Sequence, residues 1–110
     1  MFANCVKLEE IKIDKFDTGL IRDMSYMFSN CSSLETVNVL SFDTSALTKM
    51  NYMFAYSGIK TLNLSSFNTL NIKTFEGVFE ECQGLNLTLV ENNCKNLIST
   101  IPDYVNVTKL

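Results

Sequence analysis

Three consecutive segments of the chain carry the same pattern of residues. Residues 1–26, 27–52 and 53–77 each begin with Met-Phe, and the third segment is one residue shorter than the other two. Repeated units of about 20–50 residues are typical of solenoids, in which each unit buries its apolar side only by stacking on its neighbours. The pattern therefore predicts a stack of coils in which equivalent residues of successive copies lie over one another.

Within each copy, the apolar residues fit a short strand, a turn and then a short helix. The strand residues are Leu8, Ile11 and Ile13, then Leu34, Val37 and Val39, then Ile59, Leu62 and Leu64, and the residue that follows each strand is Phe16, Phe42 or Phe67. The residues expected on the helix are Met24, Met27 and Phe28, then Leu47, Met50, Met53 and Phe54, then Phe75, Val78 and Phe79. The first sets alternate as strand residues do, and the second sets recur at spacings of three and four, as on one face of a helix.

These patterns predict an α/β repeat fold, with a parallel β-sheet on one face of a solenoid and short helices or 3-10 turns on the other. We expect a single domain over residues 1–110, with coils at 1–26, 27–52, 53–77 and 78–89. Residues 90–110 depart from the register, because Asn93-Cys94 follows only 12 residues after Cys82 and leaves no room there for a helix. This segment either caps the stack or belongs to a different type of repeat.

Composition excludes several classes of protein. The net charge is −3 and no stripe of Lys and Arg is present, which argues against a nucleic-acid partner. The apolar runs are far too short to span a membrane. The first residues have no signal-peptide pattern and repeat the Met-Phe of the later copies, so we expect further repeats or another subunit at the N-terminal end.

Catalytic chemistry is not supported by the residues present. The chain has no histidine, and no serine or cysteine has a plausible activating partner. Its four glycines are scattered and do not form a loop suited to phosphate. We therefore expect a protein that is not an enzyme and that has no cofactor.

The cysteines are interpreted as core residues. Cys5, Cys31 and Cys82 occupy one column of the copies, and Ser57 stands at the missing step. Stacked side chains at strand spacing lie farther apart than the Cβ atoms of a disulfide, and a line of residues does not surround a zinc ion. We expect buried, reduced thiols and no metal site. Because Cys94 lies outside the regular register, a Cys82–Cys94 disulfide stays open.

Asp17 and Asp43 share a second column, which continues as Asn68. Paired carboxylates are able to act as acid and base or to hold Ca²⁺. Asp-Thr before a helix more often supplies turn and N-cap hydrogen bonds, and the asparagine in the third copy fits that use. We interpret the column as turn and capping residues.

The candidate binding residues are the strand residues that point away from the core, on the concave side of the expected sheet. They form one row of Glu10, Thr36, Thr61 and Asn86 and a second row of Lys12, Asn38, Asn63 and Thr88. Short polar side chains of this kind form a flat hydrogen-bonding surface suited to a protein or glycan partner, although a merely solvated face is the competing interpretation. Tyr26, Tyr52 and Tyr56 are alternative contact residues, or residues that cover the edges of the coils.

The second copy resembles the leucine-rich repeats of the BspA-like bacterial surface proteins. The resemblance lies in Met27-Phe28, Cys31, Leu34, Val39, Ser41-Phe42-Asp43-Thr44-Ser45, Leu47-Thr48 and Met50, and it extends over Met1 to about Leu89. Ser57, Asn68 and Gly19 depart from the family pattern. The resemblance implies a leucine-rich-repeat solenoid located extracellularly or at the cell surface, with an adhesion-type role in binding protein or host matrix. The alternative is a structural building block of a larger extracellular assembly.

Overall fold

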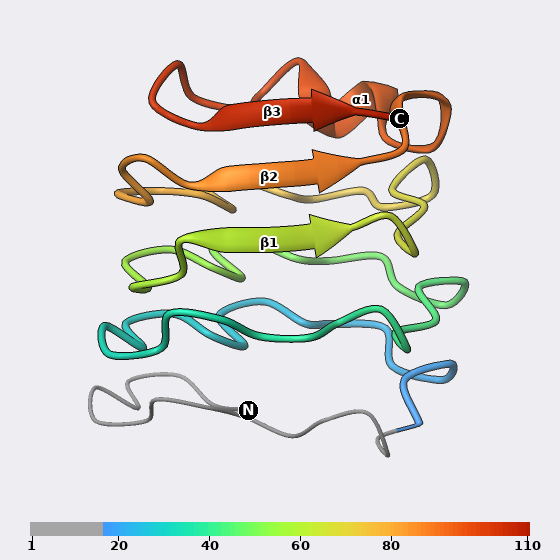
Figure 1. The fold of residues 1–110 in the computed structure, drawn as a ribbon. Helices are drawn as coiled ribbons and strands as arrows, with labels where there is room; N and C mark the ends of the chain where they lie inside the picture. Colours follow the sequence, from blue (N-terminus) through green and yellow to red (C-terminus); the bar gives the residue numbers. More distant parts are fainter. Residues whose placement is uncertain (1–16) are drawn as a thin grey trace.

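The computed structural model describes residues 17–110 and shows a small α/β fold with a parallel sheet (Figure 1). Strands β1 (Thr61–Leu64), β2 (Asn86–Leu89) and β3 (Asn106–Lys109) lie side by side in that order. The 3-10 turn η1 (Glu91–Asn93) and the one-turn helix α1 (Lys95–Ile98) connect β2 to β3. The parallel sheet expected from the sequence is thus confirmed, with strands where the third copy and residues 85–89 predicted them.

The strands pair without any shift of register. Leu62 lies beside Leu87, which in turn lies beside Val107, and the outward residues are paired in the same way. Leu62 and Leu87 are buried, whereas Thr61 and Asn86 are exposed. Since successive strand residues point to opposite faces, this register places the apolar rows on one face of the sheet and the polar rows on the other.

The core consists of equivalent apolar residues from successive copies in contact with one another. The rings of Phe28 and Phe54 are 5.5 Å apart, and those of Phe54 and Phe79 are 6.0 Å apart. Phe42 and Phe67 form a second stack at 6.1 Å, whereas Phe16 lies outside the described residues. All five described rings are buried, so truncation of one of them to alanine removes about 3–5 kcal/mol of stability.

The prediction of short helices at Met24–Phe28, at Met50–Phe54 and over residues 75–79 is wrong, because these segments are successions of turns. In the first two segments, the backbone N–H groups alternate between a turn bond to the residue three before and a bond to the next copy. The bonds between copies join Met24 N to Lys49 O, Tyr26 N to Asn51 O, Met50 N to Thr74 O, Tyr52 N to Glu76 O and Phe54 N to Val78 O, at 2.8–3.0 Å. About half of the backbone N–H groups that would bond within an α-helix therefore donate to carbonyl groups of the neighbouring copy.

Two residues in each turn segment adopt the left-handed backbone conformation. Tyr26, Tyr52 and Gly77 occupy one such column, with φ values of 62°, 54° and 61°. The second column is Asn30, Tyr56 and Glu81, with φ values of 61°, 58° and 60°. Each of these residues except Gly77 is the third residue of a four-residue turn closed by a backbone bond, such as Cys82 N to Phe79 O, and this turn type requires positive φ at that position.

The strand expected over Leu34–Val39 is reduced to an isolated bridge between Thr36 and Thr61. Two side chains bond to the backbone at the end of this segment. The Asn38 Oδ1 atom accepts a hydrogen bond from Leu40 N, and the Ser66 hydroxyl donates to Val39 O. The second copy therefore follows the sheet without forming a regular strand.

A column of buried threonines joins successive copies by hydrogen bonds. Thr18, Thr44 and Thr69 are 2%, 5% and 0% exposed. Thr44 Oγ1 accepts a bond from Asn68 N and donates one to Asn68 O, and Thr18 makes the same pair of bonds with Asp43. Because both backbone groups are satisfied by one hydroxyl, these polar residues are buried without an unpaired group.

Residues 90–110 continue the stack through the same type of contact. Thr69 N donates to Asn93 O, and Thr69 also exchanges hydrogen bonds of 2.7 Å with the Asn96 side chain. The Tyr104 hydroxyl accepts a bond from Glu81 N and donates one to Phe79 O. The segment expected to be irregular or capping thus contains η1, α1 and β3, and it is joined both to the third copy and to residues 78–89.

Substitution of Thr44 by valine should destabilise the protein by about 1–3 kcal/mol, because it removes the partly buried hydroxyl that bonds to both backbone groups of Asn68. Thr36→Val is the matched control, since the Thr36 side chain is exposed, and should change stability by less than about 0.5 kcal/mol. Unfolding in urea measures both. Equal effects of the two substitutions would contradict the role assigned to the threonine column.

Substitution of Glu81 by glycine should stabilise the protein by about 0.5–1 kcal/mol, because glycine adopts positive φ without the steric cost that other residues incur. Glu80→Gly is the control: Glu80 itself does not have a positive φ, so glycine there should destabilise the protein by a similar amount. Thermal unfolding of both variants tests the prediction, and a loss of stability in Glu81→Gly would contradict it.

Candidate functional site

The sheet brings together six of the eight residues predicted to form the binding surface. Thr36 lies beside Thr61, Thr61 beside Asn86, and Asn63 beside Thr88. The set comprises Thr36, Asn38, Thr61, Asn63, Asn86 and Thr88, which we call the polar sheet face. Glu10 and Lys12 lie outside the described residues. The strand register thus produces the two expected polar rows over the second copy, β1 and β2.

Both rows continue onto β3, which the sequence analysis did not anticipate. Asn106 lies beside Asn86, and Thr108 lies beside Thr88. The Asn106 Nδ2 atom donates to Asn86 Oδ1 at 3.3 Å. The signal was present in the sequence, because Asn106-Val-Thr108 repeats the pattern of Asn86-Leu-Thr88. The irregular spacing after Cys82 concealed that the two segments are equivalent.

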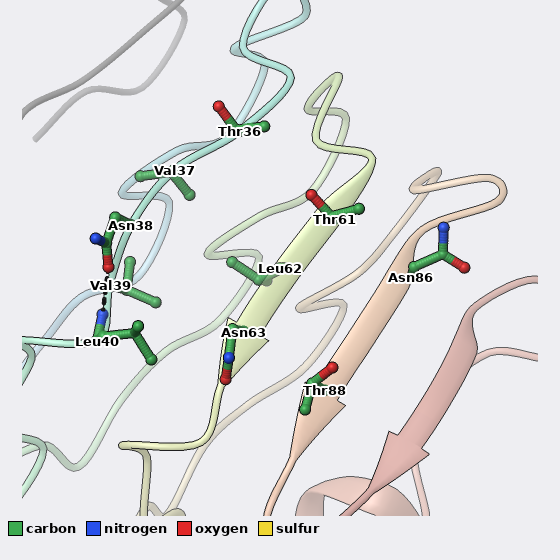
Figure 2. Close-up of a pocket in the computed structure, with 10 residues that line it drawn as sticks. All are labelled: Thr36, Val37, Asn38, Val39, Leu40, Thr61, Leu62, Asn63, Asn86 and Thr88. Carbon is green, nitrogen blue, oxygen red and sulfur yellow. Dashed lines mark hydrogen bonds between the residues drawn. The ribbon is translucent and has the colours of Figure 1, made fainter.

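The polar sheet face surrounds a shallow pocket of about 390 Å³ (Figure 2). All six residues of the face line it, together with Val37, Val39, Leu40 and Leu62. Figure 2 shows the polar side chains arising from three neighbouring segments of backbone, on the same side of the sheet. Leu40 is 49% exposed and supplies an apolar contact at one side of the pocket.

Two asparagine side chains of the face are held in a fixed orientation by their own turns. Asn38 Oδ1 accepts a bond from Leu40 N at 3.0 Å (Figure 2), and Asn63 Oδ1 accepts one from Ser65 N at 2.9 Å. Only the carbonyl oxygen of an amide is able to accept such a bond. The NH₂ groups of both residues are therefore the atoms that remain for a ligand.

The pocket offers hydrogen bonding and no acid–base chemistry of its own. None of the described residues that line it is ionisable. A nearby ion pair, Lys60–Glu35 at 3.5 Å, lies at the start of the strands, and both of its side chains are largely exposed. The arrangement is suited to holding a neutral or polar partner by many weak bonds.

The column of Asp17, Asp43 and Asn68 forms turns, as the sequence predicted, although no helix follows. Asp17 accepts a bond from Gly19 N, Asp43 from Ser45 N and Asn68 from Leu70 N. Hydrogen bonds from the Ser45 side chain and backbone lower the pKa of the Asp43 carboxyl. Among residues 17–110 no three Cys, Asp or Glu side chains converge in a way that would hold a metal ion.

The cysteines lie in the core, as expected for those that the structure describes. Cys82 and Cys94 are both buried free thiols, so no disulfide joins them. Cys82 lies 3.9 Å from the Ser57 hydroxyl, which confirms that Ser57 fills the missing step of the cysteine column. The Cys82 thiol also donates to Phe54 O at 3.1 Å. Cys31 is buried in the same column, and Cys5 lies outside the described residues.

The tyrosines form a second exposed feature, among the turn segments. The rings of Tyr26 and Tyr52 stack at 5.4 Å, and Tyr26 and Tyr56 are about half exposed. Tyr52 lies so close to the backbone of Gly77 that a Cβ atom at Gly77 would be 2.3 Å from the ring. Glu76, the largest of several causes, raises the pKa of Tyr52. The tyrosine rings therefore cover part of the turn segments and remain accessible to solvent.

Alkylation should show that the core thiols are protected. Burial raises the pKa of the Cys82 and Cys94 thiols, so the reactive thiolate is disfavoured. We expect iodoacetamide at pH 8 to leave both residues unmodified in the folded protein and to label both in guanidinium chloride, as measured by peptide mass spectrometry. A cysteine introduced at the exposed Asn71 is the positive control. Rapid labelling of Cys82 in the folded state would contradict the assignment.

Among residues 17–110, no helix combines the length and the apolar character required to cross a membrane.

Comparison with known proteins identifies the family of the chain. No curated protein and no solved structure matches the chain. One family model, described as "Mycoplasma protein of unknown function, DUF285", matches residues 1–108. Because this match covers almost the whole sequence, the chain belongs to the DUF285 family.

Proposed function

We propose that this chain is a non-catalytic leucine-rich-repeat solenoid that acts at the cell surface or after secretion as an adhesion-type binding module. The polar sheet face is the surface proposed to contact a macromolecular partner. The observation that carries the proposal is the alignment of Thr36, Thr61 and Asn86 and of Asn63 and Thr88 around one pocket. An ordered polar surface of this kind, built by stacked layers, is the usual binding surface of solenoid proteins.

The solenoid assignment is supported by the way in which the copies meet. Backbone bonds join the turn segments of successive copies, and the phenylalanine and threonine columns place equivalent residues in contact. Such contacts between neighbours are what a repeat needs to bury its apolar side. The leucine-rich-repeat type, the adhesion role and the extracellular location come from the resemblance to BspA-like surface proteins, and the absence of catalysis from the lack of histidine and of an activated nucleophile.

A structural building block of a larger assembly is the second candidate. Strand β3 lies at the end of the sheet, and an edge strand presents backbone groups to which another chain can pair. One feature opposes pairing at that edge. The row of Leu64 and Leu89 ends in Lys109, whose ammonium lies 4.0 Å from Glu91. A charge at such a position is a recognised defence against edge association, so adhesion is the better supported role.

Adhesion to immobilised extracellular matrix from animal cells tests the proposal. Thr61→Lys places a long charged side chain in the centre of the polar sheet face and should reduce binding at least about tenfold, since it obstructs the pocket. Asn71→Lys adds the same charge at an exposed position outside the pocket and should bind like the parent chain. Surface plasmon resonance gives the affinities.

Two outcomes would contradict the proposal. Equal loss of binding in Thr61→Lys and Asn71→Lys would indicate a general effect of charge. A parent chain that shows no adhesion and that associates into ordered oligomers in light scattering would favour the building-block role.

A further inference from the structure

The polar sheet face presents hydrogen-bond donors in fixed positions. The Asn38 and Asn63 carbonyl oxygens are occupied by Leu40 N and Ser65 N, so their NH₂ groups are the parts left to a ligand. The Asn86 carbonyl oxygen receives a bond from Asn106, which leaves the Asn86 NH₂ group in the same situation. A ligand complementary to this face must carry acceptors.

The spacing of these donors defines the direction in which a ligand lies. Each strand contributes only two outward residues, such as Thr61 and Asn63 on β1. A chain that ran along one strand would therefore meet two polar side chains. A chain that crosses the strands meets a new pair at every step of about 4.8 Å, from the second copy through β1 and β2 to β3.

The length of this step distinguishes between polymers. An extended polypeptide advances about 3.3 Å per residue, and its carbonyls on one side recur at about twice that distance, so it does not match the strand spacing. A pyranose ring in an extended β-linked chain advances by nearly one strand spacing. The described lining residues carry no charge, and they include none of the Trp, Tyr or Arg residues that dominate protein interfaces. These features favour a neutral glycan over a protein.

We propose that the polar sheet face binds a neutral polysaccharide rich in acetamido groups, lying across the strands. Acetamido carbonyls are strong acceptors and pair with the NH₂ groups of Asn38, Asn63 and Asn86, while the threonine hydroxyls bond to ring hydroxyls. Leu40 contacts the apolar face of a ring. This inference rests on the proposed function, because it names the ligand class of the same surface.

Calorimetry with the full chain and chito-oligosaccharides, which are β-linked N-acetylglucosamine oligomers, tests the inference. Affinity should rise from the dimer to about the tetramer, because longer chains reach more strands. Cellotetraose, which lacks the acetamido carbonyl, should bind about tenfold more weakly. No binding of any chito-oligosaccharide, or binding that does not depend on length, would overturn the proposal.

Asn63→Asp removes the NH₂ donor while keeping the turn; it also adds one negative charge, which the control variant adds elsewhere. Aspartate is able to accept the turn bond from Ser65 N as asparagine does, but it replaces the NH₂ donor with an acceptor. We expect about tenfold weaker binding of chitotetraose. Asn68→Asp is the matched control, since Asn68 makes the same type of turn away from the pocket and its column contains Asp43; it should bind like the parent chain.

A second variant keeps the result interpretable if Asn63→Asp alters the fold. Thr61→Val removes a hydroxyl of the face with little change of shape and should weaken binding several-fold. Circular dichroism and thermal unfolding verify that each variant is folded. Unchanged affinity in folded Asn63→Asp and Thr61→Val would contradict the glycan site.

Digestion of the animal matrix with endo- and exo-β-N-acetylhexosaminidases, which hydrolyse the glycosidic bonds of acetamido sugars, distinguishes a glycan partner from a protein partner. Adhesion that is lost after this digestion agrees with the glycan inference. Adhesion that survives digestion but is abolished by Thr61→Lys means that a protein occupies the face, which overturns this inference and leaves the proposed function intact. If the untreated matrix is not bound at all, the proposed function itself is contradicted.

Discussion

Backbone hydrogen bonding between successive layers is the interaction on which the rest of the structure depends. It operates on both sides of the molecule: strands β1, β2 and β3 pair on one side, and the turn segments pair on the other, as Met50 does with Thr74. Bonds on both sides prevent a layer from slipping or tilting against its neighbour. Equivalent side chains must then superpose, so the phenylalanine stacks, the threonine column and the polar rows all follow from one constraint.

The sequence predicted what depends on equivalence between copies. It predicted the parallel sheet, the buried columns, the place of Ser57 in the cysteine column and the rows that contain Thr61 and Asn63, because residues that recur in each copy have the same environment in each layer. It did not predict the turns at Tyr26 and Tyr52. Spacings of three and four suit consecutive turns as well as a helix, and only the partners of the backbone N–H groups distinguish them.

The remaining differences between sequence and structure arise where a side chain replaces a backbone partner. The Ser66 hydroxyl donates to the carbonyl of Val39, and the strand expected in that segment is reduced to a bridge. Asn96 bonds to Thr69 from a segment with no clear register, and this contact helps to position the part of the chain that ends in β3. Such bonds depend on the three-dimensional position of one hydroxyl or amide, which periodicity does not encode.

The chemistry of the polar sheet face is a consequence of how its strands end. Asn38 and Asn63 each use the carbonyl oxygen to close the turn after the strand, so the fold uses one of the two acceptor sites of the amide and neither of its two donors. An aspartate closes the same turn, as Asp43 does elsewhere, but it would leave only an acceptor. Asparagine and aspartate therefore close this turn equally well. What asparagine adds at these two positions is the NH₂ group that points away from the sheet. That difference is the reason to seek the ligand of this face among neutral molecules rich in carbonyl acceptors.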